Sequence, residues 1–341
     1  MTVGEPGSLT PGRGTGNAIE VAIVHQPHVD SAGFMHSALF YRGEREYLAG
    51  VVPFILDGLR RGEPVLVAVP ARHLGLLRDG LGEACAKVTM ADMGDVGRNP
   101  ARAMGAMSAF AEKHRDRRVR MVGEPVWPGR SADEYPGCVE NEALANTLFA
   151  GREVTALCPY DACGLDQEVL ADARSTHPLL WRDGTVDRNA DYAPDEALAR
   201  YNRPLPSDTM AVAYTVRELA DLSAARSFAA RYARWLGLSP EGIASLQLIA
   251  TELATNSLQH TGGVCRLAFW QYKGHIVCEA SDAGRLDDPL AGRRPPTADG
   301  LAGRGLFLVN TVADLVRTHA TATGTTIQAY LRLGVEERSR P

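Results

Sequence analysis

One stretch, TELATNSLQH at 251–260, places Glu252, Asn256 and His260 four residues apart. On an α-helix, residues with this spacing lie on one face, one turn above the next. An Asn amide oxygen is a hard, neutral ligand suited to Mg²⁺, which also keeps water and phosphate oxygens. A carboxylate one turn earlier can orient or deprotonate a hydroxyl group that attacks a γ-phosphate. The pattern indicates a metal-nucleotide site, but a solvated helix face can carry the same residues.

Two glycine-containing stretches follow in the chain. Asp282 and Gly284 come after a strand-like run, where the carboxylate could accept a hydrogen bond from an adenine amino group. GLAGRG at 300–305 precedes a predicted helix, and Gly303 and Gly305 would let backbone N–H groups reach phosphate oxygens. The stretch has no Walker lysine and is therefore not a P-loop. Each signal is weak alone, but their order along the chain is specific.

The elements predicted around these residues form one α/β unit. Ser239 and Pro240 fit the N-cap and first position of the second long helix. A tight Lys-Gly turn between two strand-like runs is typical of an antiparallel hairpin. The predicted elements are a strand at 210–215, helices at 217–237 and 239–260, the hairpin CRLAFWQYK and HIVCEASD, a helix at 303–313, and two final strands.

Residues 210–335 resemble the GHKL-type ATPase domain of histidine kinases, gyrase and bacterial anti-sigma serine kinases. The segment DLSAARSFAARYARWLGLSPEGIASLQLIATELATNSLQH is most similar to the last group. The resemblance implies an α/β sandwich with ATP between the long helices and a lid at 283–300. It also implies that Asn256 binds Mg²⁺, that Glu252 is the catalytic base and that Asp282 contacts adenine. The other residues it implies around ATP are Gly284, Gly303, Gly305, Thr325 or Thr326, and Arg304, which could instead be solvated.

The N-terminal half has a different pattern. From 18 to 180, apolar runs such as IEVAIVHQ and PVLVAVP alternate with amphipathic stretches, which predicts a layered α/β domain with parallel strands. These residues resemble the MEDS sensory domain, named from methanogen, methylotroph and the DcmR regulator. The resemblance implies a sensory role and a fold related to RecA-like domains. The resembling motifs are HSALFY at 36–41, Glu46, Pro53-Phe54, Gly58-Leu59, Gly62-Glu63, Val69-Pro70, Gly123-Glu124, Trp127, EALAN at 142–146, CPYD at 158–161 and THP at 176–178.

Several polar or aromatic residues of this half fall near predicted strand ends, where open α/β sheets bind ligands. The sensory candidates are His36, Tyr41, Glu124, Trp127, Glu142, Cys158 and Asp161. For His36 and Glu124 a sensory role and a structural role are both open. For the other five we favour core packing or capping. The six cysteines form no C-x2-C pair, and with no secretion signal we expect reduced thiols. Cys158 and Cys163 are close enough in sequence to react together, but we favour buried small hydrophobic residues over a redox or metal role.

Composition sets the domain layout and excludes some functions. A chain of 341 residues has room for two domains, and its net charge of −5 gives no basic footprint for nucleic acid. Residues 1–17 are rich in Gly, Pro, Ser and Thr and are predicted to be a disordered tail rather than a signal peptide. With no membrane-length apolar run, we expect a cytoplasmic protein. The predicted layout is a sensory domain at 18–180, a polar linker with one short helix at 181–208 and an ATPase domain at 209–335.

The sequence indicates no dimerising helical hairpin with a phospho-acceptor His before the ATPase domain and no receiver domain after it. We therefore interpret the chain as an anti-sigma factor and serine/threonine kinase that uses Mg·ATP. It would sequester a sigma factor and phosphorylate a STAS-type anti-anti-sigma protein, with an unknown small molecule as signal. A non-catalytic ATP-dependent binding module, an unorthodox histidine kinase and a protein whose sensory half carries the main activity are alternatives. A homodimer is also open.

Overall fold

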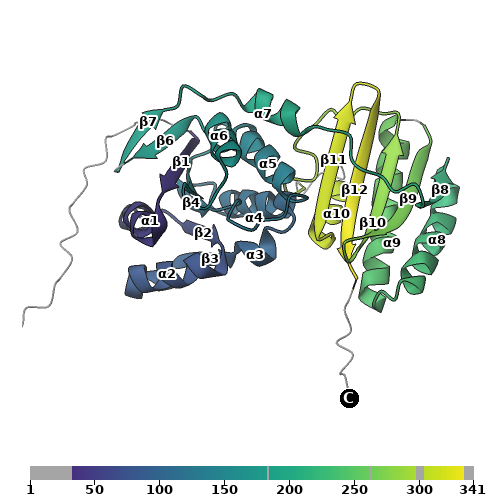
Figure 1. The fold of residues 1–341 in the computed structure, drawn as a ribbon, viewed down its shortest axis with the longest axis horizontal. Helices are drawn as coiled ribbons and strands as arrows, with labels where there is room; N and C mark the ends of the chain where they lie inside the picture. The colour runs from purple at the N-terminus through teal and green to yellow at the C-terminus, as the bar shows by residue number, and fades with distance from the viewer. Residues whose placement is uncertain (1–32, 183, 262, 297–302, 334–341) are drawn as a thin grey trace, which may run out of the picture.

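The computed structural model describes residues 33–182, 184–261, 263–296 and 303–333. They form two α/β bodies that lie next to each other along the longest axis (Figure 1). The predicted disordered tail at 1–17 and the strand predicted in IEVAIVHQ lie outside the described residues. Among the residues that are described, no helix is both long enough and apolar enough to cross a membrane.

The first body is built on a seven-stranded sheet with the order β3-β2-β4-β5-β1-β6-β7. Its first six strands pair in parallel, as the alternation of strands and helices predicts, and β7 is antiparallel to β6. The strands are β1 (Met35–Tyr41), β2 (Val65–Val69), β3 (Val88–Asp92), β4 (Val119–Gly123), β5 (Val154–Asp161), β6 (Leu179–Arg182) and β7 (Thr185–Arg188).

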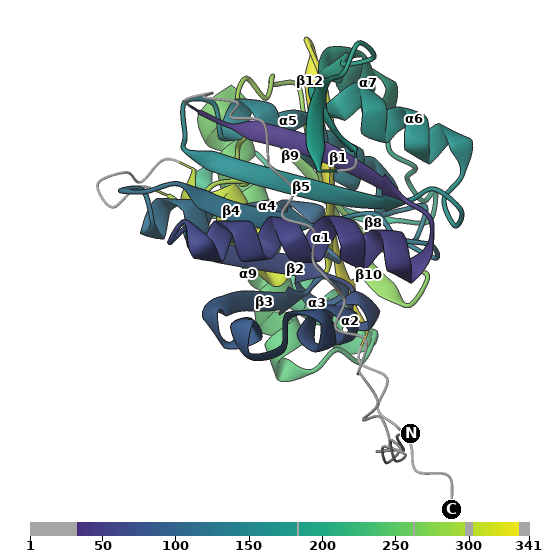
Figure 2. The same cartoon turned by 90° about the vertical axis from the view of Figure 1, so that its left-hand side faces the viewer.

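Helices cover both faces of this sheet. α1 (Gly43–Arg60) crosses one face in Figure 2 and buries Tyr47 and Phe54 against strand residues such as Val67. The preceding strand residue, Leu66, points the other way and packs in the cluster that includes Ala111. The remaining helices are α2 (Ala71–Leu81), η1 (Gly82–Lys87), α3 (Met93–Val96), α4 (Pro100–Lys113), α5 (Tyr135–Leu148) and α6 (Gln167–Thr176). Because strand residues alternate between faces, every buried strand contributes to both layers.

The segment 181–208, predicted to be a linker, carries more structure than its composition suggests. β7 forms a hairpin with β6, and α7 (Pro194–Tyr201) is the expected short helix, with Ala197 fully buried. β7 is an edge strand whose side chains are mostly exposed, so it lacks the apolar signal by which the other strands are found. Beyond α7 the chain crosses to the second body, where Gln328 Nε2 donates to the Pro206 carbonyl at 2.8 Å.

The second body is an antiparallel five-stranded sheet with the order β11-β12-β10-β9-β8. The β9–β10 hairpin turns at Lys273 and Gly274, whose φ angles of 44° and 74° confirm the predicted Lys-Gly turn. Its strands are β8 (Val212–Val216), β9 (Cys265–Tyr272), β10 (His275–Asp282), β11 (Leu315–Thr321) and β12 (Gly324–Arg332).

Three helices cover one face of this sheet. They are α8 (Leu222–Trp235), which follows η2 (Leu219–Asp221), α9 (Pro240–Thr261) and α10 (Arg304–Val312). Leu253 and Val309 pack there against Phe269. α9 begins as predicted, because the Gly242 N–H donates to Ser239 Oγ at 3.1 Å. The opposite face carries a separate cluster that includes Trp270 and Tyr330.

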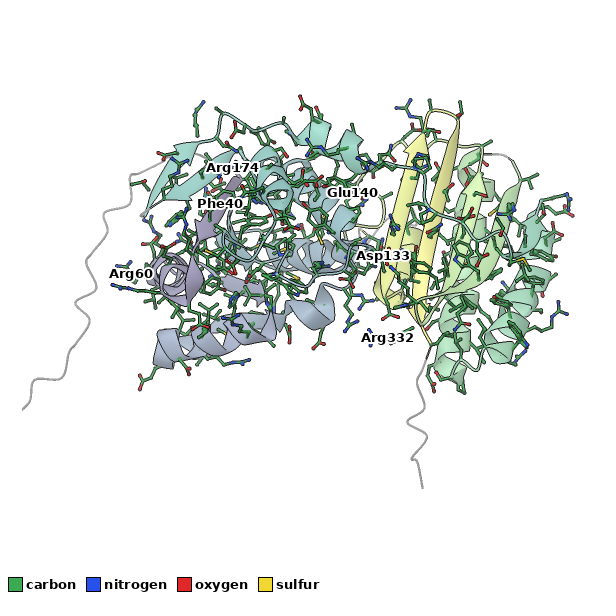
Figure 3. All side chains as sticks on the ribbon, in the orientation of Figure 1. Phe40, Arg60, Asp133, Glu140, Arg174 and Arg332 are labelled. Atoms are coloured by element: carbon green, nitrogen blue, oxygen red, sulfur yellow. The ribbon has the colours of Figure 1, made fainter. Side chains whose placement is uncertain are left out.

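The two bodies touch where α4 and α5 meet α10, β11 and the loop between β10 and α10. Asn99 Nδ2 donates to the Asn310 carbonyl at 2.9 Å, and Arg102 donates to the same oxygen at 3.3 Å. Lys273 pairs with Asp133 at 2.8 Å. Figure 3 labels Asp133 at this boundary. The first body therefore contacts the second beside the residues predicted to surround a nucleotide.

Candidate functional site

The predicted catalytic residues lie on α9. Glu252 and Asn256 are half-buried, and neither side chain has a hydrogen-bond partner among the described residues. A Cβ on Gly305 would lie 2.8 Å from Glu252 Oε2, so glycine lets that carboxylate approach the first turn of α10. The first N–H groups of a helix lack intrahelical partners and attract negative charge. Glu252 and Asn256 are thus free to meet a ligand near a helix N-terminus.

Asp282 ends β10 with its carboxylate fixed in place. Ser257 Oγ donates to Oδ2 at 2.5 Å, and the Gly284 N–H donates to Oδ1 at 2.8 Å. A side chain on Gly284 would clash with the Thr261 methyl group. The chain can therefore pack this closely against the last turn of α9 only with glycine at this position. Each carboxylate oxygen keeps a second lone pair for another donor, such as an exocyclic amino group.

The register of β12 separates the two candidate threonines. Thr325 pairs with Asp282, and its hydroxyl donates to the Gly284 carbonyl at 2.8 Å. Thr326 points to the opposite face of the sheet, the side on which Tyr330 packs. Thr325 therefore joins Asp282 and Gly284, and Thr326 does not.

The glycine stretch is described from Gly303 onward. Gly303 is the N-cap of α10 and has a left-handed φ of 80°, which favours glycine. Arg304 begins the helix and is exposed. Residues 297–300 of the predicted lid lie outside the described part of the chain, but its earlier part is held by the first body. There Leu290 packs in a cluster with Met104 and Leu144.

Glu252 and Thr261 mark the length of this site along α9. Nine residues of helix rise about 14 Å, which suits a nucleotide with three phosphates. The adenine candidates Asp282, Gly284 and Thr325 lie at one end, and Glu252 with Gly305 lies at the other. Ser257 and Thr261, which sequence reasoning did not single out, fix the adenine end. The sequence feature that could have identified Ser257 is its position directly after Asn256.

Three of the seven sensory candidates form one buried cluster in the first body. His36 Nε2 lies 3.0 Å from Glu142 Oε2 and 3.4 Å from Cys158 Sγ. His177, which was not singled out as a site residue, adds its Nε2 at 3.0 Å from the same carboxylate oxygen. The sequence feature that could have identified His177 is the THP motif at 176–178. His36, for which a sensory role was left open, therefore lies in a buried cluster of polar side chains.

Burial sets the protonation of this cluster. Burial and the nearby His177 lower the pKa of His36, which favours neutral imidazole. Burial, together with the neighbouring Glu142, raises the pKa of the Cys158 thiol well above its usual value. Burial raises the pKa of Glu142, but the neighbouring His177 and His36 outweigh this effect and hold the pKa below its usual range. The cluster is thus a carboxylate enclosed by imidazoles and a thiol.

Glu124 and Tyr41 form a second cluster, at the carboxyl ends of β4 and β1. The Tyr41 hydroxyl donates to Glu124 Oε1 at 3.2 Å, and His73 Nδ1 lies 2.6 Å from Oε2. Tyr47 stacks on His73 with ring centroids 4.2 Å apart. Glu124 has no exposed surface, and burial raises the pKa of its carboxyl although His73 and Tyr41 lower it.

The last two sensory candidates have structural partners. The Trp127 ring lies under the Arg130 guanidinium at 4.4 Å and packs in a small core cluster with Met93. Asp161 Oδ1 accepts the backbone N–H groups of Cys163 and Gly164, both at 3.0 Å. The structural roles that the sequence favours for these two residues remain predictions.

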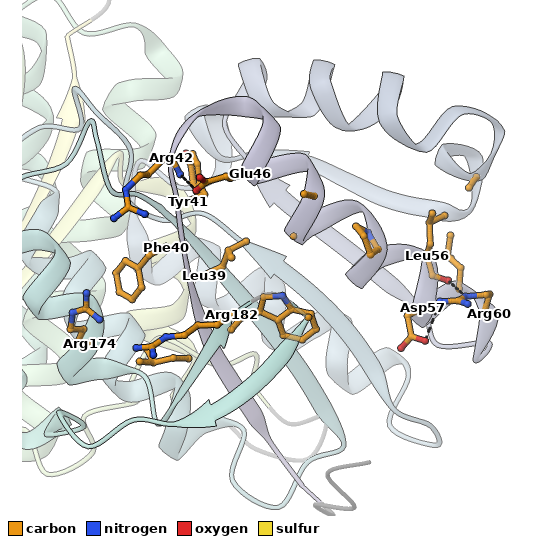
Figure 4. A pocket seen from close by; sticks show the side chains of 18 of the residues that line it. Leu39, Phe40, Tyr41, Arg42, Glu46, Leu56, Asp57, Arg60, Arg174 and Arg182 are labelled. Carbon is orange, nitrogen blue, oxygen red and sulfur yellow. Dashed lines mark hydrogen bonds and ion pairs between the residues drawn. The ribbon is translucent and has the colours of Figure 1, made fainter. Parts of the chain in front are cut away.

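A cavity of about 1180 Å³ lies elsewhere in the first body, between β1, α1 and β6 (Figure 4). Its lining includes Arg42, Arg60, Arg174 and Arg182. Tyr41 is the one sensory candidate in its lining. The cavity is remote from the α9 residues, which belong to the other body, so its volume says nothing about nucleotide binding.

Comparisons with known proteins agree with this division. Residues 35–178 match the model of the MEDS domain, the methanogen/methylotroph, DcmR sensory domain. Residues 215–331 match the model of the histidine kinase-like ATPase domain. The chain thus carries an N-terminal MEDS domain and a C-terminal histidine kinase-like ATPase domain, and the ATPase domain implies ATP binding. Both resemblances and the mixed α/β fold class predicted from the sequence are confirmed.

Similarity to solved structures is limited. One match is a chain in the crystal structure of the SiaB-SiaC complex from Pseudomonas aeruginosa, at 11% identity. The match covers 35% of the present chain and 88% of the chain in that complex, with a TM-score of 0.29. No curated protein matches the chain.

Proposed function

We propose that this chain is an ATP-dependent regulatory protein kinase. Its C-terminal domain would transfer the γ-phosphoryl group of ATP to a serine or threonine of a STAS-type anti-anti-sigma protein, and would sequester a sigma factor. The MEDS domain would supply the signal. One observation carries the proposal: the Glu252 carboxylate lies at the first turn of α10, one helical turn before Asn256, and has no other partner among the described residues.

The adenine end of the site would recognise the base through Asp282. Its two oxygens already accept from Ser257 and Gly284, so the carboxylate is held rigid with a lone pair left for the adenine amino group. Thr325 holds the Gly284 carbonyl and thereby the turn behind the base. Preorganisation of this kind avoids an ordering cost on binding.

The phosphate end would use the N-terminus of α10 and Asn256. Backbone N–H groups at a helix start stabilise phosphate oxygens. Asn256 offers an amide oxygen with no competing partner among the described residues, a donor that fits Mg²⁺. Mg²⁺, when bound, neutralises charge on the transferring phosphoryl group.

Glu252 would act as the general base. It would accept the proton of the attacking serine or threonine hydroxyl while that oxygen bonds to the γ-phosphorus. The bond from the γ-phosphorus to the β–γ bridging oxygen breaks, and ADP leaves with that oxygen. General-base help is typically worth about 10²–10⁴ in rate. Gly305 lets the Glu252 carboxylate lie close to the first turn of α10, because the Cβ of any larger residue would contact that carboxylate.

The test is phosphotransfer with purified components. The full chain is incubated with γ-labelled ATP, Mg²⁺ and each STAS-domain protein encoded in the same genome. We expect label on one STAS protein that resists acid and is released by alkali, as phosphoserine and phosphothreonine behave. Glu252→Gln should lose transfer while keeping ATP. Glu241→Gln, in the first turn of the same helix, is the matched control and should transfer normally.

Other outcomes identify the alternatives. Acid-labile, alkali-stable label on the chain itself would indicate a histidine kinase. ATP binding without any loss of γ-phosphate would indicate a non-catalytic binding module. Equal transfer by wild type and Glu252→Gln would exclude Glu252 as the base. Capture of a sigma factor by the immobilised chain, with and without Mg·ATP, tests the sequestration half of the proposal.

A further inference from the structure

We propose that the first body holds a transition-metal ion of the zinc class, with His36, Glu142, Cys158 and His177 as its ligands. Their ligand atoms all lie within 4.8 Å of one another, and they come from β1, α5, β5 and the end of α6. Each of the four side chains is buried or nearly so. Four elements far apart in sequence thus converge on one small volume.

The hydrogen bonds around the two imidazoles aim both Nε2 atoms at this volume. His177 Nδ1 lies 2.7 Å from the Ala173 carbonyl oxygen, which only accepts, so Nδ1 carries the proton. His36 Nδ1 lies 3.2 Å from Asn146 Oδ1. The Asn146 amide is oriented by its NH₂ group, which donates to the Thr176 carbonyl at 2.9 Å, so its oxygen faces His36. In each neutral ring, Nε2 is therefore the atom with a free lone pair.

The two lone pairs are not equally satisfied. The Cys158 thiol, 3.4 Å away, can donate to His36 Nε2, but no group among the described residues donates to His177 Nε2. His177 Nε2 is buried and makes no hydrogen bond, although Glu142 Oε2 lies 3.0 Å away. That short distance joins two acceptors unless a positive charge lies between them. Buried polar atoms without partners are rare and costly. A cation bonded to both imidazoles and to the carboxylate would satisfy every one of these atoms.

The distances and the ligand types select the metal. Tetrahedral Zn²⁺ with bonds of about 2.0–2.3 Å places its ligand atoms about 3.3–3.6 Å apart. The separations here are 3.0 Å from each Nε2 to Glu142 Oε2 and 3.4 Å from His36 Nε2 to Cys158 Sγ, so a slight opening accommodates the ion. Imidazoles with a thiolate favour zinc-like metals over Mg²⁺ or Ca²⁺.

Two further features fit a metal site. The outer nitrogens of the imidazoles donate to Asn146 and to the Ala173 carbonyl, the kind of support that orients metal-binding histidines. A cavity of about 50 Å³ reaches His36, Glu142 and Cys158 and would give the ion a route inward. Glu142 also lies next to Asn141 on α5, which bonds the lid residue Arg293 at 3.1 Å. The ion would therefore bind one residue away from a contact with the ATPase domain.

The experiment uses the full chain, freed of metal by a chelator and titrated with Co²⁺ and then with Zn²⁺. We expect one equivalent of Co²⁺ to give tetrahedral d–d bands and a thiolate-to-cobalt charge-transfer band, both abolished by Zn²⁺. Cys158→Ser should remove the charge-transfer band, and His177→Ala should weaken binding on the order of 100-fold. Cys163→Ser changes the exposed cysteine of the turn after β5 and should leave both unchanged.

A second measurement does not depend on variants that fold. X-ray absorption of the Zn²⁺-loaded wild type should show two imidazole nitrogens, one oxygen and one sulfur. Octahedral cobalt spectra, a zinc shell without sulfur, or affinity lost in Cys163→Ser but kept in Cys158→Ser would each overturn the proposal. So would a folded wild type that binds neither ion at micromolar concentrations, because the cluster would then be held by protons alone.

Discussion

The Arg293 guanidinium, in the loop between β10 and α10, donates to the Glu140 carboxylate of α5 at 2.8 Å. The two side chains are only 12% and 16% exposed. Arg293 Nε also donates to Asn141 Oδ1, and Nη1 donates to the Pro289 carbonyl. One arginine thus joins the lid of the ATPase domain to the helix that carries Glu142. A ligand in the MEDS domain can change the affinity for ATP only if it favours one of two conformations of the lid that differ in contacts of this kind.

Glu140→Gln should weaken ATP binding by loosening the lid. The neutral amide keeps the side-chain volume and one acceptor but loses the charge-assisted hydrogen bond to Arg293. ATP binding would then have to supply the free energy that orders the lid. Coupling energies between sites are about 1–3 kcal/mol, which is roughly 5- to 150-fold. We expect a loss near the lower end, measured by calorimetry with a non-hydrolysable ATP analogue. Arg294→Gln, whose partner Asp288 lies within the loop, is the control. Unchanged affinity in Glu140→Gln would mean that the contact is only structural.

Asp282→Asn should impair ATP binding more than any change at the lid. Both carboxylate oxygens accept hydrogen bonds, and the amide NH₂ group would face a donor at one of them. Losing a hydrogen bond to a charged group costs about 1.5–3 kcal/mol, roughly 10- to 150-fold in affinity. Asp287→Asn, at an exposed position of the loop, should bind ATP normally. Equal affinities for the two variants would remove Asp282 from the adenine site.

Thr325→Val and Thr326→Val form a matched pair on one strand. Valine keeps the shape of threonine and removes the hydroxyl. At Thr325 that hydroxyl holds the Gly284 carbonyl, so its loss should cost about 0.5–1.5 kcal/mol of binding, up to roughly tenfold in the Kd for ATP. Thr326 faces the other side of the sheet, and its substitution should leave the Kd unchanged. A larger effect at Thr326 would contradict the assignment.

Gly305→Ala should separate catalysis from stability. Alanine loses less backbone entropy than glycine in a helix, by up to about 0.5–1 kcal/mol, but its Cβ in this first turn of α10 would lie 2.8 Å from Glu252 Oε2. We expect an unchanged or raised melting temperature together with slower phosphotransfer. In a Glu252→Gln background the same substitution should cost nothing more, because the displaced base is already absent. Independent, additive losses in the double variant would show that Gly305 acts through some other residue.

Local pattern was sufficient for most elements of this fold. The two strand-like runs and the Lys-Gly turn between them predict the β9–β10 hairpin, and Ser239 predicts the start of α9, all from neighbours in sequence. β7 was missed because an edge strand with exposed side chains has no apolar signal. The chemistry of α9 was visible because Glu252 and Asn256 are one helical turn apart.

Long-range pairing was beyond this reasoning. Thr325 and Thr326 are distinguished only by the register of β12 against β10, which no local pattern specifies. His36 is on β1 and His177 follows α6, yet their rings lie with centroids 4.0 Å apart, and His73 reaches Glu124 from α2. Such clusters depend on which strand ends are neighbours, so their members were identified individually but not as sets.

Glu124→Gln should change how the stability of the first body depends on pH. Burial raises the pKa of Glu124 in the folded protein above its ordinary value of 4.5, against the lowering effect of His73 and Tyr41. The folded state then binds more protons than the unfolded state between these two pKa values. The free energy of unfolding therefore falls as pH rises from about 4.5 through the folded pKa, and the loss is complete above it.

Glutamine cannot ionise, and its amide oxygen can still accept from Tyr41 or His73 at these positions. The variant should therefore lose less stability than wild type as pH rises across this window. Urea titrations between pH 4 and pH 8 would measure both curves. Glu44→Gln, at an exposed site in the first turn of α1, controls for the change of net charge. Parallel curves for wild type and Glu124→Gln would show that His73 and Tyr41 offset burial completely, so that Glu124 has the same pKa in both states.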